Sequence, residues 1–220
     1  MKVLLLAAGQ GQRMRPKSLD CPKPLLQCGQ HRLIEYHLYQ LAAAGFEEII
    51  INVSYRSQDF KPILGDGQRY GLHIEYSHEP QPCYETAGAV IHALPMLGDA
   101  PFLMISSDIY TDFAWHSLHH QQPDYAHLIL RAPTQLTSQG DFHLEQGKIT
   151  GAGAYLYANI GVFNPSLFRS WPLCRLPLRR VLQAHLRQPG RITGACWSGR
   201  WHNLSTPSQL AALHQQLLSE

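Results

Sequence analysis

Charged side chains are scarce in this sequence of 220 residues. They make up 15% of the chain, whereas about 25% is usual for a globular protein. The apolar share is an ordinary 45%, which excludes a supercharged or intrinsically disordered chain. No stretch approaches the roughly 18 consecutive apolar residues of a membrane-spanning helix. The length suits one folded domain, and we expect residues 1–220 to form it.

Cysteine pairs with metal-binding spacing are also missing. The five cysteines are odd in number and none shows the C-x-x-C spacing, which excludes a disulfide framework and a zinc knuckle. The apolar segment at residues 3–8 is shorter than the roughly 7 to 15 apolar residues of a secretory signal. We therefore expect reduced thiols and a cytoplasmic location.

Glu220 is the one acidic residue in the last third of the chain. Residues 146–219 hold eight basic residues and no acid, whereas residues 1–145 hold 10 basic and 15 acidic residues. The net charge of +2 hides this asymmetry. A basic segment suggests an anionic partner, and composition alone leaves open a phosphate, a nucleic acid or a membrane surface.

Strands and helices alternate along the first half. Buried strands are predicted at 2–8, 48–53, 72–76 and 101–106, and helices at 33–44, 57–64 and 86–94. Such alternation is typical of βαβ units with a parallel sheet. Less regular strands follow at 126–131, 141–145, 155–163 and 192–197, with helices at 178–186 and 207–218. The pattern predicts a single-domain α/β fold, Rossmann-like, with a mixed and mostly parallel sheet flanked by helices.

The loop after the first strand is rich in glycine and basic residues. It reads L-A-A-G-Q-G-Q-R-M-R-P over residues 6–16, and P-K-P-L follows at 22–25. Glycine lets the backbone approach a phosphate, and Arg13 and Lys23 supply positive charge. The dinucleotide fingerprint requires glycine where Met14 stands, and the P-loop pattern has no match. The loop is therefore either a phosphate loop of another type or a plain turn between strand and helix.

Taken with P-K-P-L, this loop resembles the signature of the sugar-1-phosphate nucleotidyltransferases. Further stretches resemble the bacterial N-acetylmuramate-1-phosphate uridylyltransferases of peptidoglycan recycling: L-I-E-Y-H-L at 33–38, L-G-D-G at 64–67, E-T-A-G at 85–88, A-L-P-M-L-G-D-A-P-F at 93–102 and G-D-F at 140–142. The resemblance runs almost end to end. It implies the nucleotidyltransferase type A fold and a reaction that joins UTP and N-acetylmuramate-1-phosphate into UDP-N-acetylmuramate and pyrophosphate.

The resemblance also assigns roles to single residues. Arg13 and Lys23 take the catalytic positions, and Asp141 and Asn159 lie where relatives contact the sugar. Ser107 and Asn159 both replace a glycine usual in the family. The nucleotide-binding positions are Ala7, Ala8, Gly9, Gly11, Gln12, Arg13, Lys23, Glu79, Glu85, Thr86, Gly88 and Ser107.

Asp108 follows the apolar run at 102–105, at the end of a strand where open α/β sheets bind ligands. The resemblance makes it a ligand of Mg²⁺, and the alternative is a turn or helix-capping aspartate. Asn203 stands where the similar uridylyltransferases have a second aspartate, so it is either an amide ligand or a sign that metal binding is lost. Asp112 is expected to cap a helix.

Several alternatives stay open. The expected partners are UTP and a sugar-1-phosphate, with no nucleic acid and no membrane, for a monomer or weak homodimer. Alternative functions are those of a mannose-1-phosphate guanylyltransferase, a cytidylyltransferase, or a nucleotide- or sugar-phosphate-binding protein with a degenerate site. His116, His119 and His120 are expected on an exposed helix face, since no second cluster with ligand spacing accompanies them.

Overall fold

A mixed sheet organises the chain in the computed structural model, which describes residues 1–133, 140–186 and 190–219. Its parallel half has the order β6–β1–β4–β5. These strands are β1 (Val3–Leu6), β4 (Glu48–Val53), β5 (His73–His78) and β6 (Phe102–Ser106). Their sequences are mostly apolar because helices cover both faces of the sheet.

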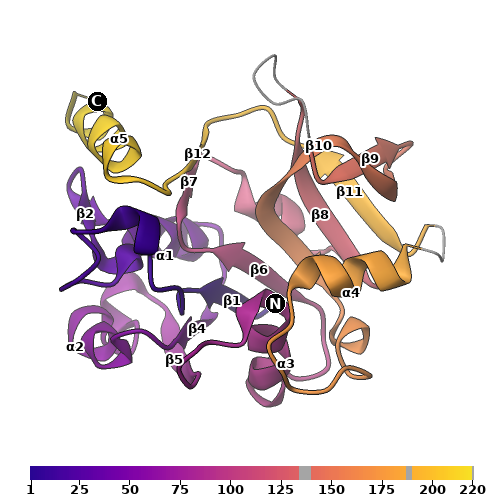
Figure 1. Cartoon of the computed structure of the whole chain (residues 1–220), viewed down its shortest axis with the longest axis horizontal. Coiled ribbons are helices and arrows are strands. Elements are labelled where there is room, and N and C mark those ends of the chain that lie inside the picture. Colours follow the sequence, from indigo (N-terminus) through magenta and orange to yellow (C-terminus); the bar gives the residue numbers. More distant parts are fainter. Residues whose placement is uncertain (134–139, 187–189, 220) are drawn as a thin grey trace.

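The second half of the sheet continues from β6 through antiparallel pairing. The long strand β10 (Lys148–Phe163) pairs antiparallel with β6, β8 (Ala126–Arg131) and β9 (Phe142–Glu145), and β11 (Ile192–Cys196) lies parallel to β8. Figure 1 shows this half beside the parallel half, and β10 is the strand that borders β6. The predicted fold class, a mostly parallel sheet flanked by helices, is confirmed.

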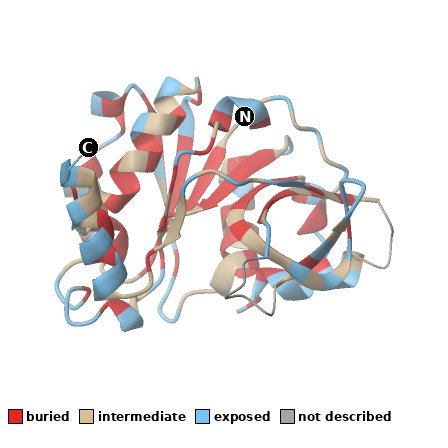
Figure 2. Ribbon diagram, turned by 90° about the horizontal axis from the view of Figure 1, so that it is seen from above, coloured by how far each residue is buried: buried red, intermediate tan, exposed pale blue. Residues whose placement is uncertain are grey.

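Helices pack on both faces of the sheet. Along β1, Val3 and Leu5 contact the layer of α1 (Leu33–Ala43) and α2 (Phe60–Leu64). Leu4 faces the other layer, which holds α3 (Glu85–Leu97) and α4 (Leu178–His185). In Figure 2 the buried strands lie between these helices. The alternation along β1 therefore builds two separate apolar layers from one strand.

The remaining elements are short or peripheral. Helix α5 (Pro207–Ser219) packs with Met14, Cys28 and Leu33 in a third apolar cluster. Two small ladders join β2 (Gln27–Cys28) to β3 (His31–Arg32) and β7 (Ile109–Thr111) to β12 (Trp201–Asn203). Short 3₁₀ helices lie at Gln12–Met14, Lys23–Leu25, Ser57–Asp59, Gln68–Tyr70, Trp115–Leu118 and Pro165–Leu167. Within the described ranges, none of the helices has the length and apolar character needed to span a membrane.

Three predictions about local structure were wrong. Strand β10 starts at Lys148 rather than 155, because the glycine-rich segment before Tyr155 pairs with β9 although its composition does not indicate a strand. Asp112 does not cap a helix: its Oδ1 accepts a hydrogen bond from the backbone N–H of Arg200 at 2.8 Å. His119 is not fully exposed, since it stacks on Phe46 with ring centroids 4.0 Å apart.

Candidate active site

Two adjoining cavities open along the carboxyl ends of the central strands. The first, of about 550 Å³, is lined by the loop after β1 and the ends of β4 and β6. The second, of about 650 Å³, lies between the ends of β6 and β10 and the start of α4. They share four lining residues: Leu6, Glu85, Thr86 and Ser106. Two ligands could therefore meet at this common wall.

The glycine loop forms one side of the first cavity. Gly11 has a φ of +59°, and a Cβ there would lie 3.1 Å from the Cβ of Lys23. Its carbonyl accepts a hydrogen bond from Ser18 Oγ at 2.7 Å. Met14, fully buried, anchors the 3₁₀ turn that follows, which leaves Arg13 exposed at the cavity edge. The loop thus requires glycine at position 11 for both its backbone conformation and its close packing.

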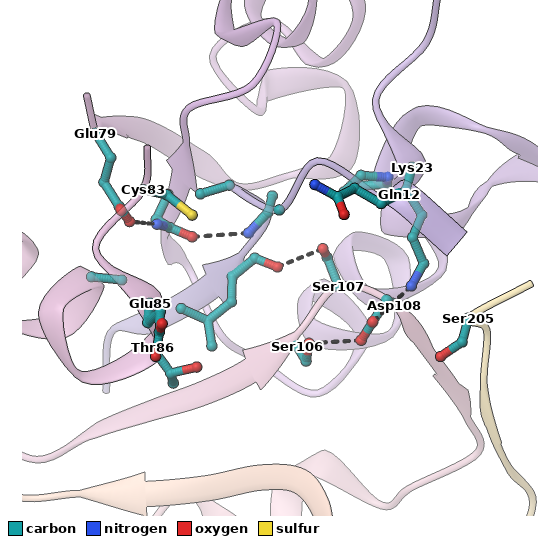
Figure 3. A pocket seen from close by; sticks show the side chains of 18 of the residues that line it. Gln12, Lys23, Glu79, Cys83, Glu85, Thr86, Ser106, Ser107, Asp108 and Ser205 are labelled. Carbon is teal, nitrogen blue, oxygen red and sulfur yellow. Dashed lines mark hydrogen bonds and ion pairs between the residues drawn. The ribbon is translucent and has the colours of Figure 1, made fainter. Parts of the chain in front are cut away.

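An ion pair spans the floor of the first cavity. Lys23 is only 8% exposed, and its Nζ lies 2.7 Å from Oδ2 of Asp108. The other carboxylate oxygen of Asp108 accepts a hydrogen bond from Ser106 Oγ at 2.7 Å. Figure 3 shows the three side chains side by side. The Lys23 ammonium and the Asp108 carboxylate are therefore fixed next to each other in the lining of the first cavity.

Ser107 contributes a buried side chain to this wall. Its Oγ donates a hydrogen bond to the carbonyl of Leu6 at 2.6 Å, and its backbone N–H donates to the same oxygen at 3.1 Å. Serine stands here in place of the glycine usual in the family, and its hydroxyl is hydrogen-bonded to the last residue of β1.

A buried carboxylate closes the other end of the first cavity. Oε1 of Glu79 accepts a hydrogen bond from the side-chain amide of Asn52, and Oε2 accepts from the backbone N–H of Tyr84 at 2.7 Å. Burial raises the pKa of Glu79. The hydrogen bond from the Tyr84 backbone, the electrostatic interaction with His92 and the hydrogen bond from Asn52 each lower it. Asn52 Oδ1 in turn accepts from the N–H of Ala7 at 2.9 Å. Through Asn52, these hydrogen bonds connect Ala7, at the start of the glycine loop, to Glu79 at the other end of the first cavity.

The second cavity holds the residues that the resemblance assigned to the sugar. Oδ2 of Asp141 accepts a hydrogen bond from the backbone N–H of Tyr157 at 2.9 Å. Asn159 lies in an irregular part of β10 with a φ of +61°. Asparagine tolerates this left-handed conformation better than most residues, which explains how it can stand in for glycine.

Asp108 lies in the turn just before β7, and Asn203 lies on β12, the strand that pairs with β7. Asn203 on β12 pairs with Ile109 on β7, and the N–H of Leu204 donates to the carbonyl of Asp108 at 2.9 Å. One carboxylate and one amide oxygen suit Mg²⁺, which prefers oxygen ligands and takes few of them from the protein. In the described part of the chain, no three His, Cys, Asp or Glu side chains group as metal ligands. The donor set therefore fits a hard cation that completes its shell with phosphate oxygens and water.

Most of the predicted site residues meet in these cavities. Those that line the first cavity are Ala7, Ala8, Gly9, Gly11, Gln12, Arg13, Lys23, Glu79, Glu85, Thr86, Ser107 and Asp108, and those that line the second are Glu85, Thr86, Asp141, Asn159 and Asn203.

Gly88 lies apart from both sets of lining residues, inside α3. A Cβ there would come within 2.4 Å of the carbonyl oxygen of Cys174. Its N–H donates to the carbonyl of Leu176 at 3.2 Å. In this structure Gly88 allows the segment before α4 to approach the first turn of α3.

The lining residues missed at the sequence level include Asn52, Cys83 and Ser106 in the first cavity and Arg179 in the second. Asn52 had a usable signal, because it interrupts the apolar run E-I-I-I-N-V near the end of a buried strand. The others carry no pattern of their own and are brought to the cavities by the fold.

Comparison with known proteins agrees with this geometry. The sequence profile of the nucleotidyl transferase family matches residues 2–139. The N-acetylmuramate alpha-1-phosphate uridylyltransferase of Neisseria meningitidis is 35% identical over 96% of this chain and 95% of its own length. The mannose-1-phosphate guanyltransferase of Neurospora crassa is 27% identical over 94% of this chain, which spans 61% of the length of that relative.

Solved structures share the fold. The structure of a Bacillus anthracis protein assigned as a glucose-1-phosphate thymidylyltransferase, in complex with sucrose, matches with a TM-score of 0.86 and 20% identity, over 100% of this chain and 96% of that one. The profile match covers residues 2–139, and the Neisseria relative aligns with most of the sequence. The chain therefore belongs to the nucleotidyl transferase family, among the sugar-1-phosphate nucleotidyltransferases.

Proposed function

We propose that this protein transfers a uridylyl group from UTP to N-acetylmuramate-1-phosphate, giving UDP-N-acetylmuramate and pyrophosphate. The observation that carries the proposal is the pair of adjoining cavities with Lys23 and Asp108 next to their common wall. A nucleotide and a sugar phosphate placed in them would bring their phosphates together there. The choice of base and sugar is supported by the Neisseria relative.

The triphosphate would lie in the first cavity. The glycine loop lines this cavity through Ala8, Gly9, Gly11 and Gln12 and would present backbone N–H groups to an anion, and Lys23 and Arg13 supply positive charge. A phosphate oxygen of the sugar substrate attacks the α-phosphorus in line, and pyrophosphate leaves with the bonding electrons. The chain need not supply a nucleophile, so its residues act by positioning and by neutralising charge.

Lys23 is the central residue in this scheme. In the structure Asp108 holds its ammonium group at the cavity floor. An arriving phosphate gives Lys23 a second anionic partner, so the cation is already in place before the substrate binds. Such preorganisation lowers the cost of stabilising charge that develops in the transition state.

Asp108 and Asn203 would hold the metal ion, which we propose to be Mg²⁺. When bound, it neutralises phosphate charge and helps to orient the reacting groups. Asn203 donates no negative charge, so affinity for the cation would depend mainly on Asp108 and on the phosphates themselves.

The base and the sugar would occupy opposite ends of the site. The base fits the Glu79 end, where Glu79 and the backbone near Tyr84 offer polar groups at the cavity wall. Asp141 and Asn159 line the cavity on the sugar side. We assign the reaction to the cytoplasm and to peptidoglycan recycling, in a monomer or weak homodimer, which size-exclusion chromatography would test.

Pyrophosphate release tests the proposal directly. The purified protein would be assayed with Mg²⁺ and each of the four nucleoside triphosphates, crossed with N-acetylmuramate-1-phosphate, N-acetylglucosamine-1-phosphate and mannose-1-phosphate. We expect turnover with UTP and N-acetylmuramate-1-phosphate above every other pair. Turnover with GTP and mannose-1-phosphate instead would favour a guanylyltransferase, and none with any pair would favour a binding protein.

A further inference from the structure

Arg179 is a cation on the wall of the second cavity. It lies in the first turn of α4, the helix that Figure 1 shows beside the half of the sheet with β8, β10 and β11. Leu178 and Leu182 of the same helix line the cavity beside it. Leu178, Val181 and Leu182 are packed into the apolar layer, so α4 is a fixed support for the arginine.

The guanidinium of Arg179 is without a partner among the residues that the structure describes. Within the described ranges of the chain, no hydrogen bond or ion pair engages it. The two acidic residues that line this cavity have other partners. Oε1 of Glu85 lies 2.9 Å from Nε of Arg175, and Asp141 accepts a hydrogen bond from the backbone N–H of Tyr157. A free cation in a ligand cavity is therefore not explained by the fold.

The phosphates of the reaction do not explain it either. Lys23 and Arg13 line the first cavity, whereas Arg179 is among the described residues that line only the second. The phosphate of the sugar substrate must approach the nucleotide at the common wall. Arg179 is thus available to a different part of the sugar.

We propose that Arg179 binds a carboxylate substituent of the sugar and selects acidic sugar phosphates over neutral ones. This inference rests on the proposed function and deepens it, because N-acetylmuramate differs from N-acetylglucosamine by an O-linked lactyl group that carries a carboxylate. A planar guanidinium binds a carboxylate through two parallel hydrogen bonds. Such a contact is lost when the substrate lacks the acid.

Arg180 provides a matched control. It is the next residue on the same helix, is exposed as Arg179 is, and is not among the residues that line either cavity. Arg179→Gln and Arg180→Gln remove the same charge from the same turn. Both side chains are exposed, so neither change should disturb folding, which thermal unfolding would verify.

The experiment compares two sugars that differ in the carboxylate. Steady-state rates at saturating UTP would be measured with N-acetylmuramate-1-phosphate and N-acetylglucosamine-1-phosphate for wild type and both variants. We expect Arg179→Gln to raise the KM for the acidic sugar about tenfold, the loss of one charge-assisted contact. The KM for the neutral sugar should stay unchanged, and Arg180→Gln should match wild type with both sugars.

The outcomes separate the inference from the proposed function. An equal rise of KM with both sugars would show that Arg179 serves a group common to them, and an unchanged KM with the acidic sugar would remove its role. Both results overturn the inference and leave uridylyl transfer standing. If wild type transfers nothing, the proposed function fails, and direct titration of the two sugar phosphates into wild type and Arg179→Gln decides the inference by the same comparison.

Discussion

Lys23 and Asp108 are opposite charges from distant parts of the chain that meet at 2.7 Å. Lys23 is almost fully buried, and such a group is costly unless it is paired. Removing one partner leaves the other without its counter-charge at the site where phosphates are proposed to bind. The functional cost of a substitution here should therefore exceed that of losing any exposed charge in the same loop.

Substitution of Lys23 tests this at the level of one residue. Lys23→Met should lower turnover by about a hundredfold or more, because a preorganised charge at the reacting phosphates is lost. Lys17→Met, on an exposed side chain of the same loop outside both cavities, should stay within about threefold of wild type. Pyrophosphate release with unfolding temperature as a control measures both. Near-normal turnover in Lys23→Met would remove the residue from the mechanism.

Asn203 offers a test of the proposed metal site. Asn203→Asp adds a second carboxylate on the strand that pairs next to Asp108, and it should lower the Mg²⁺ concentration for half-maximal activity by about tenfold. Without metal the two like charges should repel each other and lower the unfolding temperature. Asn203→Ala should shift the Mg²⁺ requirement the other way. The same Mg²⁺ dependence in all three proteins would argue against Asn203 as a ligand.

At the scale of elements, α1 supports the strand that follows Asp108. His37 on α1 is buried, and its Nε2 lies 2.8 Å from the carbonyl oxygen of Ile109. Because that oxygen can only accept, Nε2 carries the proton. Burial lowers the pKa of His37 from 6.5 to about 4, although the bond to Ile109 and the charge of Asp108 oppose the shift. The folded protein therefore favours the neutral ring.

This shift predicts an acid-sensitive stability. The stabilising effect of neutral His37 is present above the ordinary pKa of 6.5 and is lost as pH falls toward about 4. When the pH is lowered from about 7 to about 5, the titration of His37 should reduce the unfolding free energy by about 2 kcal/mol. His37→Gln can keep a hydrogen bond to Ile109 without titrating. Urea unfolding at both pH values should show a smaller loss in the variant, and equal losses would contradict the assignment.

The contact between α3 and the segment before α4 depends on Gly88. Gly88→Ala adds a Cβ that meets the carbonyl oxygen of Cys174 at 2.4 Å and the Cβ of Tyr84 at 2.6 Å. We expect a loss of about 1 to 3 kcal/mol in unfolding free energy, as for other overpacked positions. Gly151→Ala is the control, since nothing lies within 4 Å of its added Cβ and its φ is ordinary. Equal stability of the two variants would show that α3 can shift freely.

At the scale of the whole molecule, much of the fold could be predicted from the sequence and a part could not. Strand β8 and helix α1 were found to within a residue because periodic apolar residues mark them. Strands β7 and β12 are only three residues long and carry no period. Their pairing, which brings Asn203 to Asp108, depends on contacts between residues far apart in the chain.

Several basic residues in the last third of the chain form ion pairs within the folded protein. Arg169, Arg175 and Arg191 form ion pairs with Asp99, Glu85 and Asp124, all from the acidic first part. Part of the excess charge that suggested an external anion is therefore neutralised within the molecule. Sequence counts could not reveal this, because the partners lie between 67 and 90 residues apart. Arg179 and Arg180 have no such ion pair within the described ranges, and of the two only Arg179 lines a cavity.

The sheet itself predicts a gradient of local stability. Strands β1 and β6 have a hydrogen-bonded neighbour on each side and are almost entirely buried, whereas β5 lies at an edge. Hydrogen exchange followed by mass spectrometry should find the slowest amides in β1 and β6 and faster ones in β5. Equal protection of all three strands would mean that the sheet opens only as one unit.

The wall that the two cavities share has a consequence for inhibitor design. Leu6, Glu85, Thr86 and Ser106 border both spaces, so a compound that reaches past these four residues would engage both cavities at once. If a nucleotide-like fragment and a sugar-phosphate-like fragment each bind weakly, a short tether turns the second binding event into an intramolecular one. Short flexible tethers give effective concentrations of about millimolar, so the joined compound should bind far more tightly than either fragment.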